Sequence, residues 1–267
     1  MIESARLILD YMVGMTKEQF LEDSLRHDAV IRRLLLLAQG ADGRPTPAFA
    51  GSDITPELAW DIRRGTVPET LRSLAPPLHA PFTPQDLDAL DAPPFELTTP
   101  SEDGFHAFLE YAVEVAEADG KRYHDFLDLD EKKRREYFET RQLRELPPEA
   151  PAGLVPQTNL WLVSPEARLL GIVRFRHYLN DGLRLEGGHI GYEVAPTARR
   201  RNLGTVALHR TLGWIRDRRP ELADVLITCD SDNVGSRKII ERNGGLLIAS
   251  ATSKRSGKEV LRFVIDL

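Results

Sequence analysis

The stretch Val194-Ala195-Pro196-Thr197-Ala198-Arg199-Arg200-Arg201-Asn202-Leu203-Gly204-Thr205 places three arginines and a glycine between a predicted strand and a predicted helix. The strand is expected over 189–195, and the helix over 202–218, where apolar residues recur at helical spacing. The first amides of a helix lack partners and its N-terminal end is positive, so such a loop can hold a diphosphate. Three arginines alone fit a solvated basic turn at least as well as a diphosphate site. The surrounding sequence is therefore needed to choose between the two interpretations.

The residues of this loop have predicted roles in a diphosphate cradle. Asn202 and Gly204 suit a backbone that is left-handed or passes close to phosphate. Leu203 belongs to the same cradle, and Thr205 can add a hydroxyl donor. Positive charge at the mouth of the loop comes from Arg199, Arg200 and Arg201.

Around this loop, strand and helix patterns alternate from residue 95 onward. Further strands are predicted over 95–98, 158–164, 169–178, 225–229, 246–253 and 259–265, the last two as a hairpin about Ser256-Gly257. Further helices are predicted over 101–120 and 233–243, and a charged amphipathic helix within 121–146. The pattern predicts an α/β domain.

The chain before this region has a different pattern. Helices are predicted over 2–15, over 16–39 behind a capping box of Thr16 and Gln19, and from Thr55-Pro56 to Gly65. Seven prolines then lie from Pro76 to Pro100 and disfavour continuous helix or sheet, apart from a short helical turn around 85–90. The predicted domains are a helical module (1–75), a proline-rich linker (76–93) and the α/β domain (94–267).

Two motifs resemble the GCN5-related N-acetyltransferase (GNAT) family. In the family's acetyl-CoA motif, Gln/Arg-x-x-Gly-x-Gly/Ala, Arg199 matches the first position and Gly204 the last, while Asn202 replaces the first glycine. The segment 226–245 resembles the family's strand, Asn-headed helix and glycine stop, and segments within 153–192 resemble a bacterial subgroup of predicted acetyltransferases. The resemblance covers about 95–267. It implies a mixed, mostly antiparallel sheet flanked by helices, with a V-shaped cleft for acetyl-CoA.

The resemblance also implies roles for individual residues. The amide of Val194 is expected to polarise the thioester carbonyl, and Asn233 to lie near the pantetheine arm, although Asn233 is equally suited to a plain N-cap. The amine must lose a proton before attack, and Glu193 is the candidate base unless it pairs with an arginine or points to a helix; His177 is a rival. Many relatives protonate the thiolate with a tyrosine where this chain has Ile240, which leaves Tyr192 or solvent.

Two arginines on one strand face require anionic partners. Arg174, Arg176 and Tyr178 share a face by period-2 alternation. Either acids from 121–146 or a substrate carboxylate would neutralise the two arginines, and the second choice favours an amino-acid-like acceptor. Cys229, in the middle of a strand, is expected to be a buried small hydrophobe.

Composition restricts the class of protein. A net charge of −6 argues against broad nucleic-acid binding, and a single cysteine excludes an internal disulfide and a multi-cysteine metal site, so no metal is expected. No bilayer-spanning apolar run and no secretory signal are evident, which predicts a cytoplasmic protein without membrane contact.

The first 75 residues weakly resemble helical HEPN-type partners of minimal nucleotidyltransferases, in segments such as 11–16 and 60–62. That family's Arg-to-His spacing is met only by Arg72 and His79, and Pro76-Pro77 between them spoil a helical presentation. The module is therefore predicted to serve packing or homodimerisation. The leading hypothesis is an acetyl-CoA-dependent N-acetyltransferase acting on an amine of a small molecule or peptide; the alternatives are a toxin–antitoxin-related protein with a partner-binding module and a non-catalytic acyl-CoA-binding regulator.

Overall fold

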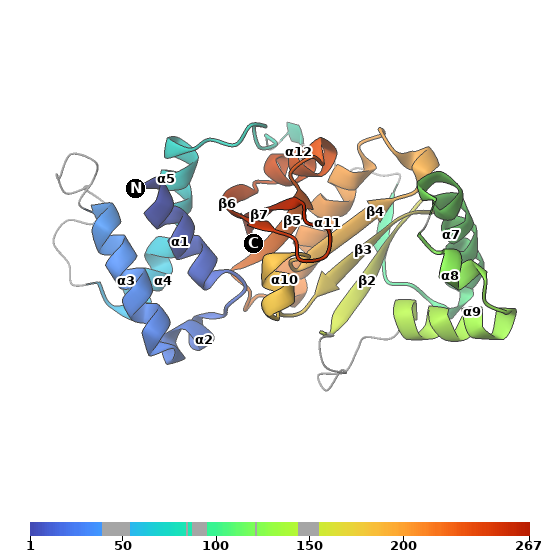
Figure 1. The fold of residues 1–267 in the computed structure, drawn as a ribbon, viewed down its shortest axis with the longest axis horizontal. Coiled ribbons are helices and arrows are strands. Elements are labelled where there is room, and N and C mark those ends of the chain that lie inside the picture. Colours follow the sequence, from blue (N-terminus) through green and yellow to red (C-terminus); the bar gives the residue numbers. More distant parts are fainter. Residues whose placement is uncertain (39–53, 84, 87–94, 121, 144–154) are drawn as a thin grey trace. The chain divides into compact units, whose positions relative to one another are not determined.

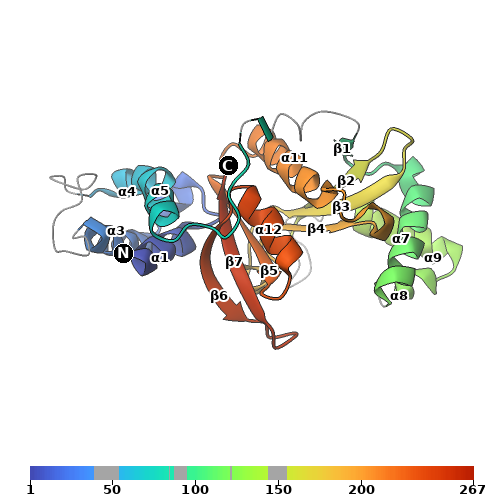
Figure 2. The ribbon, with the colours of Figure 1, turned by 90° about the horizontal axis from the view of Figure 1, so that it is seen from above.

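The computed structural model describes residues 1–267 except 39–53, 84, 87–94, 121 and 144–154. The described residues form two compact units, whose elements are labelled in Figures 1 and 2. The first unit combines 1–81, 183–188 and 215–267, and the second combines 82–182 and 189–214. Each unit therefore brings together segments that are far apart in the sequence.

A four-stranded antiparallel sheet is the centre of the second unit. Its strands, in the order β1-β2-β3-β4, are β1 (Glu96–Thr98), β2 (Gln157–Val163), β3 (Leu169–Arg176) and β4 (Ile190–Val194). These are the strands that the alternating pattern predicts. The turn between β2 and β3 is closed by the Ser164 amide, which donates to the Arg168 carbonyl. The strand order leaves β4 at one edge of this sheet.

Helices cover one face of this sheet through an aromatic cluster. They are α7 (Phe105–Asp119), α8 (His124–Leu127) and α9 (Glu131–Phe138), with a 3-10 turn at Glu102–Gly104 and a π turn at Glu139–Leu143. Phe108 of α7 stacks on Trp161 of β2, with ring centroids 6.3 Å apart. As predicted, α7 ends at Gly120 in the left-handed conformation. The single amphipathic helix expected within 121–146 is instead α8 and α9. The second of these begins at Glu131, because the Asp130 side chain accepts from the Lys133 amide and caps a new helix.

The first unit contains a three-stranded antiparallel sheet in the order β5-β7-β6. Its strands are β5 (Asp224–Asp230), β6 (Leu246–Thr252) and β7 (Glu259–Asp266), with α12 (Val234–Arg242) between β5 and β6. The predicted hairpin of β6 and β7 is confirmed, and its turn contains Gly257 at φ 71°. The helix α11 (Leu203–Arg218) has residues in both units, as does the short helix α10 (Asp181–Leu185), which the sequence analysis did not predict.

The N-terminal helices of the first unit are α1 (Ile2–Met12), α2 (Lys17–Glu22), α3 (Ser24–Ala38), α4 (Pro56–Arg64) and α5 (Thr66–Leu74). The capping box of Thr16 and Gln19 is confirmed. The single helix expected over 16–39 is wrong, because the chain leaves the helical conformation at Asp23, whose carboxylate accepts from the Arg26 amide and starts α3.

Helix α5 is not among the helices that the sequence pattern predicts, and it contains Pro68. Proline is tolerated there because the first turn of a helix needs no amide donor. The helical turn predicted around 85–90 falls largely outside the described residues. No described helix combines the length and the apolar character that a membrane crossing requires.

Ion pairs connect the N-terminal helices to β5 and β7 within the first unit. Arg63 of α4 is fully buried and contacts Asp224, which also accepts from the Gly14 amide at 2.8 Å. Asp10 of α1 holds Arg262 of β7 through both carboxylate oxygens, at 2.6 and 3.2 Å. These contacts join residues of the N-terminal helices to the C-terminal sheet within one compact unit. The domain division at 1–75, 76–93 and 94–267 remains a prediction.

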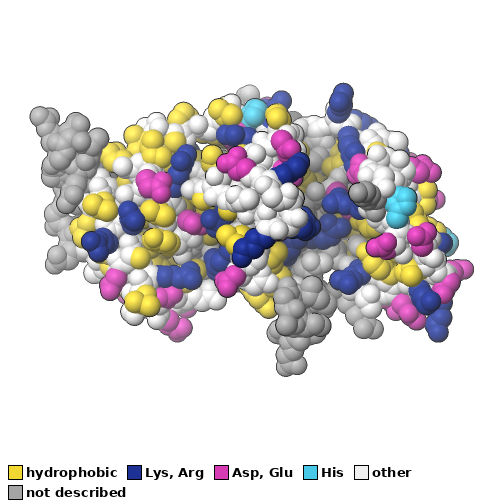
Figure 3. Space-filling view, in the orientation of Figure 1, with side chains coloured by type: hydrophobic (Ala, Val, Ile, Leu, Met, Phe, Trp, Pro, Cys, Tyr) yellow, Lys and Arg dark blue, Asp and Glu magenta, His cyan; other side chains and the backbone are white. Residues whose placement is uncertain are grey.

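Some apolar side chains of the N-terminal helices stay at the surface. Figure 3 shows such side chains over this region, and the exposed large apolar side chains of α3 are Leu25, Leu35 and Leu36. Scattered surface leucines are ordinary on a folded protein. Homodimerisation through the helices therefore remains a prediction.

Replacement of Arg63 by methionine should destabilise the first unit strongly. The change leaves the fully buried Asp224 carboxylate without its counter-charge, and loss of one member of a buried pair costs about 3–5 kcal/mol. Asp61→Asn removes an exposed ion pair with Lys17 and should cost less than about 1 kcal/mol. Urea unfolding of both variants measures the difference; equal free energies of unfolding for Arg63→Met and the wild type would contradict a stabilising role.

Candidate functional site

The edge of β4 presents a backbone amide at Val194. The Ala195 amide donates to the Leu170 carbonyl, and the Arg176 amide to the His189 carbonyl, both at 2.8 Å. Because amides along an antiparallel strand alternate in direction, the amide of Val194 points away from β3. This is the orientation that the predicted polarising role of Val194 requires.

The loop after β4 has a backbone suited to an anion. A 3-10 turn (Pro196–Ala198) leads into it, and Arg200 and Asn202 have φ angles of 61° and 63° before α11 begins at Leu203. Left-handed residues in such a turn direct successive amides toward one point and form an anion-binding nest. Asn202 thus adopts the conformation expected of the glycine it replaces.

The three arginines of the loop have different surroundings. Arg199 donates to both carboxylate oxygens of Asp119, at 3.0 and 2.9 Å, and to the Val194 carbonyl at 3.2 Å. These hydrogen bonds raise the pKa of Arg199 and lower that of Asp119. Arg199 therefore holds the loop to the end of α7, while Arg200 and Arg201 are exposed and supply the positive charge.

The remaining residues of the predicted cradle lie at the start of α11. Leu203, Gly204 and Thr205 are buried, and the Thr205 amide donates to the Asn202 carbonyl. The amides of Leu203 and Gly204 precede the first intrahelical bonds, so they are the donors that the helix end offers. The Thr205 hydroxyl is a weaker candidate because its side chain is buried.

Asn233 belongs to the first unit and caps α12. Its Oδ1 accepts from the Ser236 amide at 3.0 Å, which is the plain N-cap role. A capping side chain keeps its Nδ2 group for other partners. Ile240, which stands where many relatives have a tyrosine, is fully buried on the same helix and packs in the core.

Glu193 is the centre of a polar cluster on β4. Its Oε1 accepts from the Tyr123 hydroxyl and from Arg174 at 3.3 Å, and its Oε2 accepts from Arg122. The sequence analysis allowed for an arginine pair as the alternative to a catalytic role, and two arginines bind this carboxylate. The catalytic role of Glu193 remains a prediction.

The partner of Arg174 differs from both predicted choices. The carboxylate comes from the neighbouring strand β4, and residues 121–146 contribute the Tyr123 hydroxyl, to which Arg174 donates at 3.3 Å. His177 forms a hydrogen bond with Thr158 at 2.8 Å, which favours a structural role. Cys229 is buried, as expected, and burial raises the pKa of its thiol to about 11.

Sequence reasoning missed Arg122 and Tyr123 as site residues. They were assigned to a continuous helix, whereas Tyr123 has a φ of 65° and lies in the turn between α7 and α8. The available signal was Gly120: a glycine that ends a helix beside a basic and an aromatic residue marks a turn. What could not be read from the sequence is that this turn meets β4.

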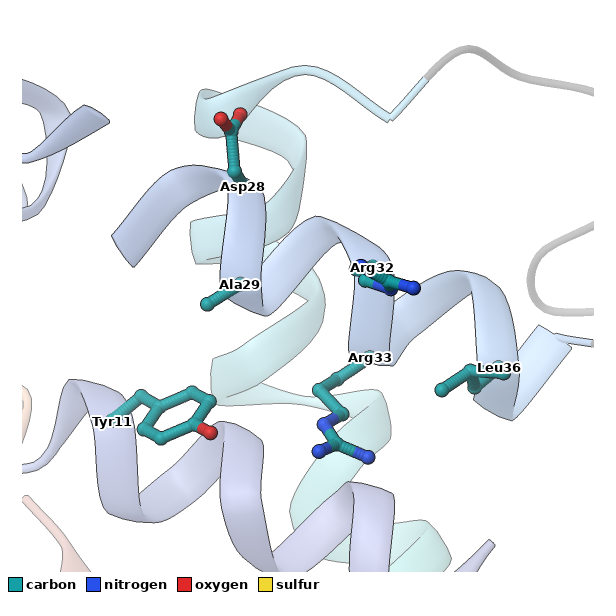
Figure 4. Close-up of a pocket in the computed structure, with 6 residues that line it drawn as sticks. All are labelled: Tyr11, Asp28, Ala29, Arg32, Arg33 and Leu36. Atoms are coloured by element: carbon teal, nitrogen blue, oxygen red, sulfur yellow. The ribbon is translucent and has the colours of Figure 1, made fainter. Parts of the chain in front are cut away.

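A separate hollow of about 480 Å³ lies on the N-terminal helices (Figure 4). Arg33 of α3 and Tyr11 of α1 extend into the space between the helices, while Asp28 points away from α1. Its other lining residues are Ala29, Arg32 and Leu36. None of them was predicted as a site residue, and no arrangement of reacting groups is present there.

A family model and several solved structures are similar to this chain. The family model described as "Acetyltransferase (GNAT) domain" matches residues 95–245. No curated protein sequence matches the chain. Among solved structures, the ribosomal-protein-S5-alanine acetyltransferase from Vibrio fischeri has 14% identity and a TM-score of 0.50, with 66% of this chain and 94% of that chain covered. A GNAT-family acetyltransferase from Bacillus anthracis has 15% identity and a TM-score of 0.45, with 66% of this chain and 96% of that chain covered. The microcin C7 self-immunity acetyltransferase, in complex with acetyl-CoA and AMP, has 12% identity and a TM-score of 0.49, with 66% of this chain and 94% of that chain covered.

Substitutions of Asn202 should test whether binding of CoA requires the left-handed backbone conformation at this position. Glycine adopts a positive φ without steric cost, so Asn202→Gly should keep the affinity for CoA. Valine at this φ costs about 1–3 kcal/mol, which corresponds to an affinity about 5- to 150-fold weaker for Asn202→Val. Isothermal titration measures both, with thermal melts as a control of folding. Equal affinities of the two variants would show that the left-handed turn is not needed.

Proposed function

The chain belongs to the GCN5-related N-acetyltransferase (GNAT) family, and on this premise we propose that it transfers the acetyl group of acetyl-CoA to an amine of a small molecule or peptide. The protein is an acetyltransferase, and acetyl-CoA is its co-substrate. The observation that carries the proposal is the succession of an outward amide at Val194, a left-handed loop at Arg200 and Asn202, and the start of α11.

The residues of the loop fit the diphosphate of CoA. The nest at Arg200–Asn202 and the first amides of α11 provide backbone donors, and Arg200 and Arg201 provide exposed positive charge. Arg199 keeps the loop in place through Asp119 and the Val194 carbonyl. Asn233 is proposed to contact the pantetheine arm through its amide group, while Oδ1 caps α12.

The amide of Val194 is proposed to stabilise the reacting carbonyl. When bound, acetyl-CoA supplies an acetyl thioester, whose carbonyl oxygen gains negative charge during attack by an amine. A fixed N–H donor aimed at that oxygen lowers the barrier without reorganisation. The hydrogen bonds between β4 and β3 hold the Val194 amide in its outward direction before any ligand binds.

Glu193 is proposed to act chiefly as a positioning residue. A carboxylate that accepts hydrogen bonds from two guanidinium groups and a phenol has little capacity left for the proton of an amine. The same contacts hold Arg122, Tyr123 and Arg174 beside Val194. The acceptor's proton then leaves through solvent or a further group.

Acetyl-CoA titration and an amine panel test the proposed function. We expect binding at micromolar concentration and CoA release with at least one amine, because the loop and the Val194 amide are both present. Binding without CoA release across small amines and peptides would favour the alternative of an acyl-CoA-binding regulator. No binding at high micromolar concentration would contradict the proposal. A cytoplasmic location remains a prediction that fractionation of the producing cells can test.

The variant Glu193→Gln should distinguish a positioning role from a base. A positioning role predicts a kcat/KM lower by about 10- to 100-fold, because the reacting groups are misplaced, with the acid limb of the pH profile unchanged. Loss of that acid limb in Glu193→Gln would instead identify Glu193 as the base. Glu131→Gln, which removes an exposed carboxylate of α9, serves as the matched control and should not change either quantity.

A further inference from the structure

Two carboxylates of α7 bind the segment that joins β4 to α11. The Oε1 atom of Glu114 accepts from the amide and from the hydroxyl of Thr197, both at 2.7 Å, and its Oε2 atom accepts from Arg168 at 2.7 Å. Asp119 accepts from Arg199 through both of its carboxylate oxygens, at 3.0 and 2.9 Å. All of these residues belong to the second unit. Thr197 and Arg199, two positions apart in the segment, are therefore both held by one helix.

Hydrogen bonds keep both carboxylates charged at neutral pH. Burial would raise the pKa of Glu114, but hydrogen bonds from the Thr197 amide and hydroxyl and from Arg168 lower that pKa overall. The hydrogen bond from Arg199 lowers the pKa of Asp119. A hydrogen bond to a charged acceptor is about twice as strong as one between neutral groups. Both acids can therefore hold the segment more firmly than uncharged side chains of the same shape would.

The held segment leads directly into the left-handed turn of the proposed diphosphate site. Thr197 and Arg199 come before Arg200 and Asn202, whose φ angles are 61° and 63°. The amides of such a turn bind an anion well when they already point toward it, because any ordering of the loop on binding reduces the affinity. Contacts that fix the backbone before the turn should therefore increase the affinity for the diphosphate.

All three guanidinium nitrogens of Arg199 already donate to the protein. The Nε atom donates to the Val194 carbonyl at 3.2 Å, and the Nη1 and Nη2 atoms donate to Asp119. Arg200 and Arg201 follow in the same loop and are exposed. This distribution favours a division of roles, in which Arg199 orients the backbone and the next two arginines attract the phosphates.

We propose that Glu114 and Asp119 are positioning residues for acetyl-CoA, which act through Thr197 and Arg199 and set the affinity of the β4–α11 loop for the diphosphate. The inference rests on the proposed function and extends the binding site to a helix outside the loop. The opposite role of Asp119 has a different consequence. If Arg199 bound the diphosphate itself and Asp119 competed for it, loss of the Asp119 charge would strengthen binding, whereas a positioning role requires that binding becomes weaker.

The variants Glu114→Gln and Asp119→Asn test this inference by titration of acetyl-CoA into the full chain. Each should raise the Kd for acetyl-CoA by about three- to tenfold, because it removes a charged acceptor and keeps the shape of the side chain. The KM for acetyl-CoA should rise equally, while kcat with an amine from the panel stays within about twofold of the wild type. The hydrogen bonds to β3 hold the Val194 amide independently of the loop, so the chemical step keeps its donor. A general loss of stability would not produce this split.

The control variant is Glu117→Gln, which removes an exposed carboxylate from the same helix and should leave the Kd and the KM unchanged. Thermal melts establish that each variant is folded. Thr197→Val, which removes the hydroxyl that donates to Glu114, replaces Glu114→Gln if that variant does not fold. Binding as tight as that of the wild type, or tighter, in either folded variant overturns the inference and leaves the acetyltransferase function intact. Failure of the wild type to bind acetyl-CoA would instead refute the proposed function.

Discussion

The antiparallel register between β3 and β4 is the constraint on which the rest of the site depends. One set of backbone hydrogen bonds turns the Val194 amide away from β3 and, at the same time, places Glu193 on the face that holds Arg174 and Arg176. A slip by one residue would turn the Val194 amide toward β3 and move the Glu193 side chain to the opposite face of the sheet. The loop that follows the same strand is held in place by the ion pair between Arg199 and Asp119.

Much of this site could be predicted from local sequence, because its local signals are strong. Asn202 adopts the left-handed conformation expected at its position, Gly120 ends α7, and the strands follow their alternating pattern. The partners of Glu193 could not be predicted: Arg122 and Tyr123 come from about seventy positions away, and only the tertiary fold brings that turn to β4. The break of the second predicted helix at Asp23 could not be predicted either. A continuous apolar pattern indicates one helix, but the Asp23 side chain caps a new helix within it.

Ion pairs and a hydrogen bond join the N-terminal helices to the C-terminal sheet of the first unit. The prolines between Ala75 and Pro100 indicate a linker, yet Arg63, Asp10 and Gly14 contact β5 and β7 within one compact unit. A buried pair such as Arg63 and Asp224 tolerates the loss of neither partner. The helices thereby support the C-terminal sheet of the first unit, which also contains Asn233.

The measurement that tests the role of the β4–α11 loop most directly is hydrogen exchange with and without acetyl-CoA. Amides bound to a ligand exchange more slowly than free ones. If the loop holds the diphosphate and Val194 the thioester carbonyl, a peptide covering 194–206 should be protected on binding, while a peptide covering β2 should not change. Saturating acetyl-CoA that protects other peptides and leaves 194–206 unchanged would contradict the assignment of the site.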